Sequence, residues 1–306
     1  MNRVRKRIHL EELQQSKWSR YPITIAVLDS GISRHPDLEG KCMVFQDFLQ
    51  HRKNPYDDNG HGTHVCGILC GSGEASKGEY RGIIPSARLV VGKVLDQNGE
   101  GQADVMIKAL DWLLENRKRY DVRLLNISVG IGNLKDKQKM LRLKTMVEAL
   151  WDCGVVVICA AGNKGPAPGS ISDIGGSQKV ITVGCYDDMP EQENMTENCE
   201  AYSGRGRLNA DIRKPDIVAP GSHIMSCCHE CEWIGNAYEK LYSAKSGTSM
   251  ATPIVTGCAA LLLQEKPYLK NSQVKDCLHY SAEDLNKPWN LQGWGMIHAK
   301  SLLENT

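Results

Sequence analysis

The sequence lacks several features that would place it in a membrane or secretory class. None of its apolar runs reaches the roughly 18 to 20 residues that a membrane-spanning helix needs. The first twenty residues are partly basic and contain no apolar stretch typical of a secretory signal. We therefore expect a cytoplasmic protein with no membrane partner, in which residues 1–20 form a short basic leader.

The sequence also lacks a charge imbalance. It has 37 basic and 36 acidic residues among 306, so the net charge of +1 gives no reason to expect nucleic acid or an anionic membrane as a partner. No internal repeat, low-complexity segment or convincing linker divides the chain. Its length suits one large α/β domain or two modest ones, and we predict one domain over residues 21–306. The oligomeric state is left open.

The twelve cysteines do not indicate a disulfide framework. Several, such as Cys159 and Cys258, lie inside apolar runs, where a thiol behaves as a small buried hydrophobe. Without a signal peptide, reduced cysteines are the simpler expectation. The dense segment CCHEC at 227–231 has two interpretations, a soft-metal site such as zinc or unpaired loop thiols. Ligands so closely spaced do not easily complete a tetrahedron, which favours the thiols.

Alternating strand and helix patterns predict the fold. Five near-continuous apolar runs are typical of strands covered on both faces, at 23–31, 87–96, 122–130, 155–163 and 179–187. Helical patterns lie between them at 64–72, 103–120 and 135–154. This alternation predicts an α/β fold, a three-layer α/β/α arrangement with a mostly parallel central sheet.

Polar residues follow three of these strands. Asp29 ends the first, Ser128 and Gly130 follow another, and Asn163 follows a third. In parallel sheets, functional residues collect in the crevice beyond the carboxyl ends of the strands. We therefore expect these residues to meet at one edge of the sheet.

The stretch GTSMATP at 247–253 precedes an apolar helix and contains Ser249. Pro253 is compatible with a helix that begins near Ser249, because the first N–H groups of a helix have no partner within it. Ser249 has two interpretations on this stretch alone. It is either the N-cap of the helix or a nucleophile beside its positive end.

Two other segments favour the nucleophile. A serine hydroxyl needs a base to take its proton, and a histidine held by a carboxylate supplies one. Asp29 in VLDSGI, His61 in NGHGTHVCG and Ser249 provide these groups in the order Asp, His, Ser. His61 and His64 also form H-x-x-H, but no carboxylate is placed as in a zinc-protease helix, so we expect His64 to be structural.

Five ordered segments carry a family resemblance, namely VLDSGI with HPDL behind it, NGHGTHVCGIL, AAGN, APG and GTSMATP. From Tyr21 onward the chain resembles the subtilisin-like serine proteases (subtilases), and its short leader is closest in style to the intracellular subtilisins. The resemblance implies a serine endopeptidase that works through an acyl-enzyme and needs no cofactor for its chemistry. It assigns Asp29 as orienting acid, His61 as general base, Ser249 as nucleophile and Asn163 as oxyanion donor.

The resemblance also implies where a peptide or protein substrate binds. Family members hold an extended peptide between two strand segments and place one side chain in a pocket, which assigns as substrate-binding residues Gly99, Glu100, Gly101, Ser128, Val129, Gly130, Ala160, Ala161, Gly162 and Asp173. Asp57, Asp58, Glu100 and Asp173 raise the hypothesis that basic substrate residues are preferred, with Asp173 as the pocket charge. Solvated loop carboxylates are the alternative.

Three further expectations depend on the family. Many subtilases bind a structural calcium through the aspartate of HPDL, here Asp37, but the loop GSGEASKGEYRG lacks the family's asparagines. A leader of this length could lie across the active site and be trimmed. The function has two alternatives, a processing peptidase for one particular precursor or a non-catalytic peptide-binding scaffold.

Overall fold

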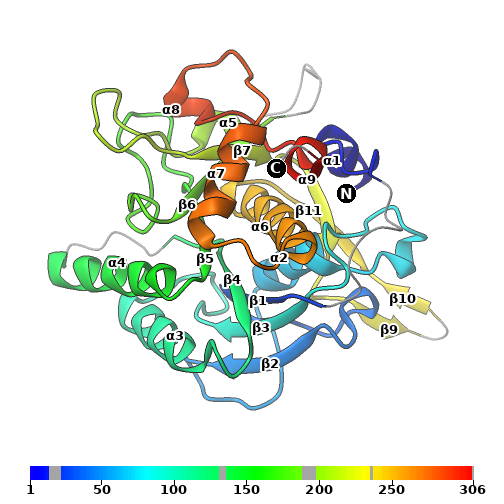
Figure 1. Ribbon diagram of the computed structural model, residues 1–306. Coiled ribbons are helices and arrows are strands. Elements are labelled where there is room, and N and C mark those ends of the chain that lie inside the picture. Colours follow the sequence, from blue (N-terminus) through cyan, green and yellow to red (C-terminus); the bar gives the residue numbers. More distant parts are fainter. Residues whose placement is uncertain (14–21, 131–135, 188–197, 235–236, 305–306) are drawn as a thin grey trace.

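The computed structural model describes residues 1–13, 22–130, 136–187, 198–234 and 237–304, and its centre is a seven-stranded parallel sheet (Figure 1). The strand order is β2-β3-β1-β4-β5-β6-β7, and all neighbouring pairs are parallel. The strands are β1 (Thr24–Asp29), β2 (Cys42–Asp47), β3 (Arg88–Lys93), β4 (Val122–Ile127), β5 (Val156–Ala160), β6 (Ile181–Tyr186) and β7 (Ile217–Pro220).

Helices cover both faces of this sheet (Figure 1). They are α1 (Asn2–Arg7), α2 (His61–Cys70), α3 (Ala103–Asn116), α4 (Lys137–Asp152), α5 (Cys199–Tyr202), α6 (Thr248–Glu265), α7 (Asn271–Ser281), α8 (Trp289–Gln292) and α9 (Ala299–Glu304). The chain therefore has the predicted three-layer α/β/α fold.

The alternation of side chains along β1 shows why its sequence is apolar throughout. Ile25 and Val27 belong to the core beneath α2 and α6, whereas Ala26 and Leu28 belong to the core beneath α3 and α4. Successive side chains of a strand point to opposite faces, and here both faces are covered. The five predicted strands correspond to β1, β3, β4, β5 and β6.

Four short strands lie between β7 and α6. β8 (Ile224–Cys227) pairs antiparallel with β11 (Tyr242–Lys245), and β9 (Glu232–Ile234) pairs antiparallel with β10 (Ala237–Glu239). His64 joins this region to α2, because its Nε2 lies 2.9 Å from the Ile224 carbonyl and 3.0 Å from the Ser243 carbonyl. Burial lowers its pKa to about 3, so His64 is a neutral structural residue, as predicted.

The amino-terminal residues are packed into the same core as α2 and α6. Met1, Val4, Ile8 and Leu10 are each at most 5% exposed and join this core. Arg5 is also buried, and its Nη1 donates to the Gly82 carbonyl at 2.8 Å. The boundary between the predicted leader and the peptidase domain falls outside the described residues, so that division stays a prediction.

The cysteines differ in one respect from the expectation that all are reduced. Cys185 at the end of β6 and Cys199 at the start of α5 are joined in a disulfide. No second disulfide forms among the described residues. Separately, none of the helices in the described ranges combines the length and apolar character needed to cross a bilayer.

Candidate active site

The site lies where the chain order of the sheet reverses. β1 lies between β3 and β4, so the connection after β1 runs toward one edge of the sheet and β4 begins the other half. Ligands of parallel α/β sheets bind beyond the strand ends at such a switch point. Asp29 is the last residue of β1, Ser128 follows β4 directly, and Asn163 follows β5. The predicted convergence of these strand ends is therefore present.

Asp29 and His61 form a direct contact. The Asp29 side chain is completely buried, that of His61 is 21% exposed, and His61 Nδ1 donates to Asp29 Oδ1 at 2.7 Å. The Ser30 N–H donates to the same oxygen at 2.7 Å. The other oxygen, Oδ2, is buried and has no hydrogen-bond partner among the described residues. One carboxylate oxygen thus holds the imidazole in a single orientation.

The pKa of His61 lies above its ordinary value. Burial is the largest single influence and favours the neutral ring. The charge of Asp29 and the hydrogen bond to it together outweigh burial, while the more distant Lys245 opposes them. The imidazole is thereby prepared to hold a proton on its far nitrogen, Nε2, when it acts as a base.

Ser249 is the second residue of α6. Gly247 occupies the N-cap position with φ 142° and no side-chain cap, so the interpretation of Ser249 as an N-cap is wrong. Its hydroxyl instead lies at the positive end of a buried helix that packs against α2. In the described residues no hydrogen bond joins this hydroxyl to His61. Such bonds often tighten only when substrate binds, so Ser249 as nucleophile stays a prediction.

Asn163 is oriented by the residue before Ser249. Its Oδ1 accepts hydrogen bonds from the Thr248 N–H at 3.2 Å and from the Thr248 hydroxyl at 3.0 Å. With its oxygen fixed in this way, the amide turns its Nδ2 toward Gly247. A Cβ on Gly247 would lie 3.1 Å from Asn163 Nδ2 and 3.5 Å from Ser249 Oγ. Glycine at 247 therefore leaves open a small space between a hydrogen-bond donor and the hydroxyl.

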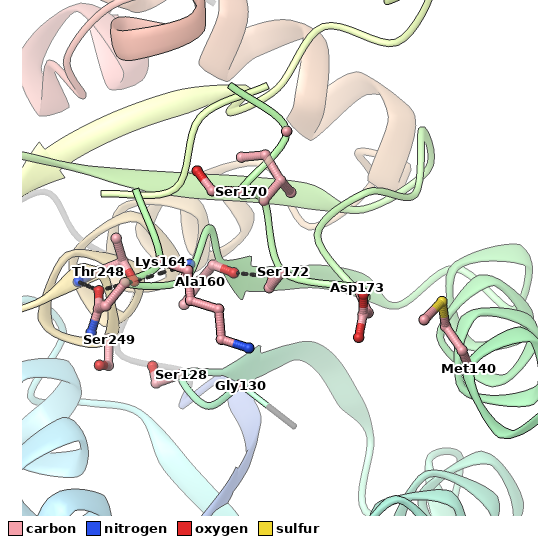
Figure 2. A pocket seen from close by; sticks show the side chains of 14 residues that line it. Ser128, Gly130, Met140, Ala160, Lys164, Ser170, Ser172, Asp173, Thr248 and Ser249 are labelled. Carbon is pink, nitrogen blue, oxygen red and sulfur yellow. Dashed lines mark hydrogen bonds between the residues drawn. The ribbon is translucent and has the colours of Figure 1, made fainter. Parts of the chain in front are cut away.

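A cavity of about 670 Å³ extends from Ser249. It is lined by Ser128, Gly130, Met140, Ala160, Gly162, Asn163, Lys164, Gly169, Ser170, Ile171, Ser172, Asp173, Thr248 and Ser249. Figure 2 shows Thr248 and Ser249 on one side of the cavity and Asp173 and Met140 on the other. The Lys164 side chain reaches into the space between them (Figure 2).

Five predicted substrate-binding residues do not line this cavity. Val129 and Ala161 are buried. Gly99, Glu100 and Gly101 lie in the loop after β3, which closes through a bridge between Leu95 and Gly101. This loop lies beside the start of α2, because Asn59 Nδ2 donates to the Gln97 carbonyl at 3.2 Å. Their role in binding an extended peptide stays a prediction.

Two of the four acidic residues suggested for substrate binding have internal partners. Asp57 is 6% exposed, and its carboxylate accepts hydrogen bonds at the start of α2. Asp58 pairs with the buried ammonium of Lys93 at 2.5 Å. The sequence did not reveal that Asp57 accepts internal hydrogen bonds, because most of its donors are backbone N–H groups, which every residue type except proline carries. It also missed Lys164, which follows Asn163 directly.

Asp37 does not fit a calcium ion. Its Oδ1 accepts from the Ser72 hydroxyl at 3.1 Å and the Ala75 N–H at 3.0 Å, and its Oδ2 accepts from the Tyr242 hydroxyl at 2.7 Å. Calcium needs six to eight oxygen ligands. The other side chains grouped with Asp37 at metal-like spacing offer a nitrogen of His35 and the sulfur of Cys227, both buried, and no second carboxylate. We therefore derive no calcium site from Asp37.

A soft metal does not fit this cluster either. His35 Nδ1 accepts from the Asp37 N–H at 3.1 Å, and its Nε2 donates to the Leu241 carbonyl at 2.7 Å, so both ring nitrogens are used. Within the described ranges, His35, Asp37 and Cys227 are the one group with metal-like spacing, and Cys228 and Cys231 are not part of it. This favours free thiols over a metal site in the 227–231 segment, with Cys227 buried at the end of β8 and Cys228 and Cys231 partly exposed.

Comparison with known proteins gives consistent similarities. The protein-family model described as "Subtilase family" matches residues 22–295 of the sequence. Serine protease AprX of Bacillus subtilis (strain 168) is 38% identical over 289 residues, covering 91% of this chain and 65% of the relative. Subtilisin of Bacillus pumilus is 34% identical over 284 residues, covering 91% of this chain and 90% of the relative.

Solved structures agree. Sphericase superimposes with a TM-score of 0.80 at 28% identity, covering 96% of this chain and 97% of its own. The S41 psychrophilic protease superimposes with a TM-score of 0.76 at 29% identity, covering 91% and 92%. The chain spans slightly less than two thirds, 65%, of the length of several curated relatives that it matches.

Proposed function

The chain belongs to the subtilase family, and we propose that it is a serine endopeptidase with Asp29, His61 and Ser249 as its catalytic triad. One observation carries the proposal. The buried Asp29 carboxylate holds the His61 imidazole at 2.7 Å, at the same strand ends where Ser249 and Asn163 line one cavity. A buried carboxylate on one nitrogen of a histidine is the arrangement that makes the other nitrogen an effective base.

The reaction follows from these groups. Ser249 Oγ attacks the carbonyl carbon of the scissile peptide bond while His61 Nε2 takes its proton, and Asp29 stabilises the imidazolium that forms. The Ser249 N–H and Asn163 Nδ2 donate hydrogen bonds to the oxyanion. The imidazolium then gives its proton to the leaving amine, which leaves an acyl-enzyme. A water molecule, deprotonated by His61, hydrolyses this ester and regenerates Ser249.

Active-site labelling tests the triad and separates enzyme from scaffold. A fluorophosphonate reacts with a serine activated by a base, so we expect stoichiometric labelling of the wild type and none of Ser249→Ala or His61→Ala. A peptide-binding scaffold would leave the wild type unlabelled. Peptide-library digestion addresses the second alternative, because cleavage confined to one sequence would indicate a processing peptidase.

The oxyanion role of Asn163 gives a kinetic prediction. Replacing Asn163 with Ala removes a donor that acts on the oxyanion rather than on the bound peptide. We expect kcat to fall by about 100- to 1,000-fold, with little change in KM, since one such donor is worth that factor. Steady-state kinetics on a chromogenic peptide measures this. An equal rise in KM with unchanged kcat would instead assign Asn163 to substrate binding.

The preference for basic substrate residues rests on Asp173. Asp173 is exposed and lines the cavity, but Lys164 lines the same cavity with the opposite charge. We expect Asp173→Asn to lower kcat/KM for peptides with Arg or Lys before the scissile bond relative to matched peptides with Leu. Asp104→Asn, an exposed acid on α3 outside the cavity, serves as the control. Equal effects on both peptide classes would remove the basic preference and leave a pocket selected by shape.

The proposed cytoplasmic location faces an opposing observation. Disulfides are rare in reducing compartments, and Cys185 is bonded to Cys199. Cell fractionation with an antibody against the chain, together with the mass of the non-reduced protein, would determine both the location and the state of this pair.

A further inference from the structure

Asp57 is the acceptor for five hydrogen bonds from two parts of the chain. Its Oδ1 accepts from the Ser30 hydroxyl at 2.8 Å and from the N–H groups of Asn59 at 3.1 Å and Gly60 at 2.8 Å. Its Oδ2 accepts from the Thr63 N–H at 2.8 Å and the Thr63 hydroxyl at 2.6 Å. Four of these bonds surround His61 at the start of α2. The fifth, from Ser30, reaches the end of β1.

Ser30 links the two residues of the acid–base pair. Its hydroxyl donates to Asp57 and accepts from the Gly62 N–H at 2.8 Å, directly after His61. Its own N–H donates to Asp29 Oδ1 at 2.7 Å, the oxygen that holds the imidazole. The side chain of Ser30 thus contacts the helix that carries the base, while its backbone contacts the acid.

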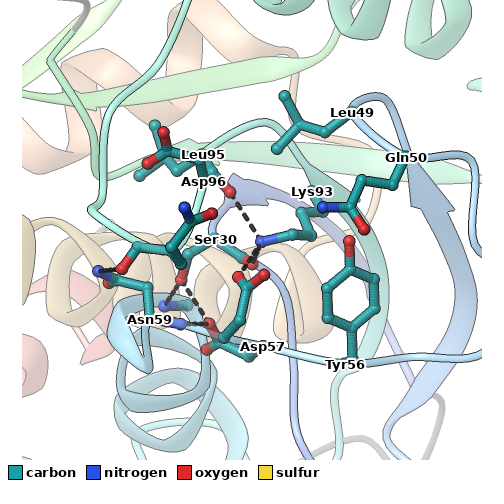
Figure 3. Close-up of polar contacts among 12 residues, drawn as sticks. Ser30, Leu49, Gln50, Tyr56, Asp57, Asn59, Lys93, Leu95 and Asp96 are labelled. Carbon is teal, nitrogen blue, oxygen red and sulfur yellow. Dashed lines mark hydrogen bonds and ion pairs between the residues drawn. The ribbon is translucent and has the colours of Figure 1, made fainter.

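Lys93 contacts Ser30 at its backbone carbonyl, whereas Asp57 contacts its hydroxyl (Figure 3). The Lys93 side chain is 1% exposed, and its Nζ donates to the Ser30 carbonyl at 2.6 Å and the Leu95 carbonyl at 2.8 Å. Its charge pairs with Asp58, the residue after Asp57. A buried ammonium with three acceptors is strongly fixed, because an ammonium or an acceptor left without its partner inside the protein costs free energy. Ser30 is therefore held between Asp57 and Lys93.

We propose that Asp57 is a positioning residue of the catalytic triad, which, through the Ser30 hydroxyl, fixes the strand end carrying Asp29 against the helix start carrying His61. The proposal rests on the proposed function, because it concerns the geometry of that acid–base pair. Asp57 itself touches no reacting atom. Its carboxylate satisfies donors on both elements, so its loss allows the two elements to shift, and small displacements of catalytic groups have large kinetic effects.

The burial and charge of Asp57 agree with this role. Burial opposes its ionisation and is the largest influence on it, but the bonds from Thr63, Gly60 and Ser30 together keep its pKa below the ordinary value. Asp57 is therefore charged whenever His61 titrates. The titratable and charged groups that act on His61 are Asp29 from β1, Asp57 from the preceding loop, Lys245 from β11 and His64 on α2 itself. His229 approaches Gly60, the residue before His61.

Two substitutions test the proposal, Asp57→Asn and Ser30→Ala, with Asp104→Asn as a matched control that breaks only an exposed pair with Lys139. We expect both test variants to lower kcat by about 10- to 100-fold with KM within about twofold, whereas the control leaves both unchanged. Because both remove the same link, their effects should be far from additive in the double variant. Additive losses, or losses in KM alone, would overturn the proposal.

A second measurement does not depend on proteolysis. In the Ser249→Ala background, NMR follows the His61 imidazole titration and the low-field Nδ1 proton shared with Asp29. Ser30→Ala removes no charge, so a lower His61 pKa or a weaker low-field signal in this variant would report a looser contact between His61 and Asp29. We expect both changes. Wild-type values for both, with only a lower free energy of unfolding, would reduce Asp57 and Ser30 to structural residues. An inactive wild type with these shifts present would contradict the proposed function and not the positioning.

Discussion

Asp29 is the residue that determines how His61 responds to pH. Its carboxylate is completely buried, and the one oxygen that accepts hydrogen bonds accepts two, from His61 and from Ser30. A buried charge this close to an imidazole stabilises the imidazolium, which is why the pKa of His61 lies above its ordinary value although burial acts against it. The same interaction stabilises the positive charge that develops on His61 during catalysis.

This raised pKa predicts an acid limb in the activity profile. His61 accepts the serine proton only when neutral, so kcat/KM should rise with pH and level off above the pKa of His61 in the free enzyme. Replacing Asp29 with Asn removes the stabilising charge, so the limb should move to lower pH and the plateau should fall by about 10⁴-fold. Profiles of kcat/KM between pH 5 and 9 measure both. An unshifted limb in Asp29→Asn would assign the titration to another group.

Single residues were predicted from sequence where a motif marks them. Asp29 and His61 were assigned from VLDSGI and NGHGTH, and the structure brings them into contact. Asp57 was considered only as an acid near the substrate groove, because an aspartate in a loop has the same sequence signal whether its oxygens face solvent or five internal donors. The Thr248–Asn163 bonds were likewise not predictable, since they depend on where two distant loops meet.

Among the elements, α6 is the one that delivers Ser249, and it does so by packing unusually closely. Gly257 on α6 faces Ile83, and a Cβ at this glycine would lie 2.6 Å from the Ile83 Cβ. No side chain fits there without movement, because interiors are close-packed. The small residue therefore determines how near α6 approaches the segment that follows α2.

The predicted effect of Gly257→Ala follows from this contact. Alanine favours a helix over glycine by about 1 kcal/mol, but overpacking a core costs about 1 to 3 kcal/mol, so we expect a net loss of stability. Gly176→Ala is the control, since its Cβ would meet nothing closer than 3.5 Å. Urea denaturation of Ser249→Ala proteins, which cannot digest themselves, compares the two. A stabilised Gly257→Ala would show that α6 has room to move.

A second element-scale prediction concerns the contact between β11 and the turn at Asp37. The Tyr242 hydroxyl donates a hydrogen bond to Asp37 Oδ2. The family resemblance had predicted that Asp37 binds calcium instead. Tyr242→Phe leaves this buried oxygen without its donor and should cost about 1 to 3 kcal/mol. The exposed Tyr268→Phe is the control. The melting temperature should fall only in Tyr242→Phe, and by equal amounts with EDTA or calcium. A calcium-dependent difference would restore a metal to Asp37.

The elements that the sequence predicted are those buried on both faces or strongly periodic. The five central strands and the helices α2, α3, α4 and α6 are of this kind. The strand β2 was missed because it lies at the sheet edge and is mostly half-buried, so its pattern is weak. The six-residue α1 has no side-chain cap, and β8 and β11 are four residues each, too short to show a period.

At the scale of the whole molecule, the site is assembled from both halves of the sheet and from helices on one face. Asp29 comes from the centre of the sheet, His61 and Ser249 come from α2 and α6, and the cavity walls come from the segments after β4 and β5. The core beneath α2 and α6 is shared with the amino-terminal residues, whose Ile8 carbonyl accepts from the Ala299 N–H of α9. Rigidity of the acid–base pair thus depends on packing that reaches both ends of the described chain.

This packing predicts that residues 1–13 stabilise the domain rather than cover its cavity. Leu10 is fully buried in the shared core, so Leu10→Ala should cost about 2 to 5 kcal/mol, while the exposed Lys6→Ala should stay within about 0.5 kcal/mol of the wild type. Urea denaturation in the Ser249→Ala background measures stability, and fluorophosphonate labelling rates of the active proteins measure access to the serine. A segment lying across the site would give the opposite pattern: faster labelling in Leu10→Ala with unchanged stability. Because residues 2–10 bond to Glu79, Gly82, Ser222, Glu283 and Ala299, which lie outside the cavity lining, we expect unchanged labelling below the melting temperature.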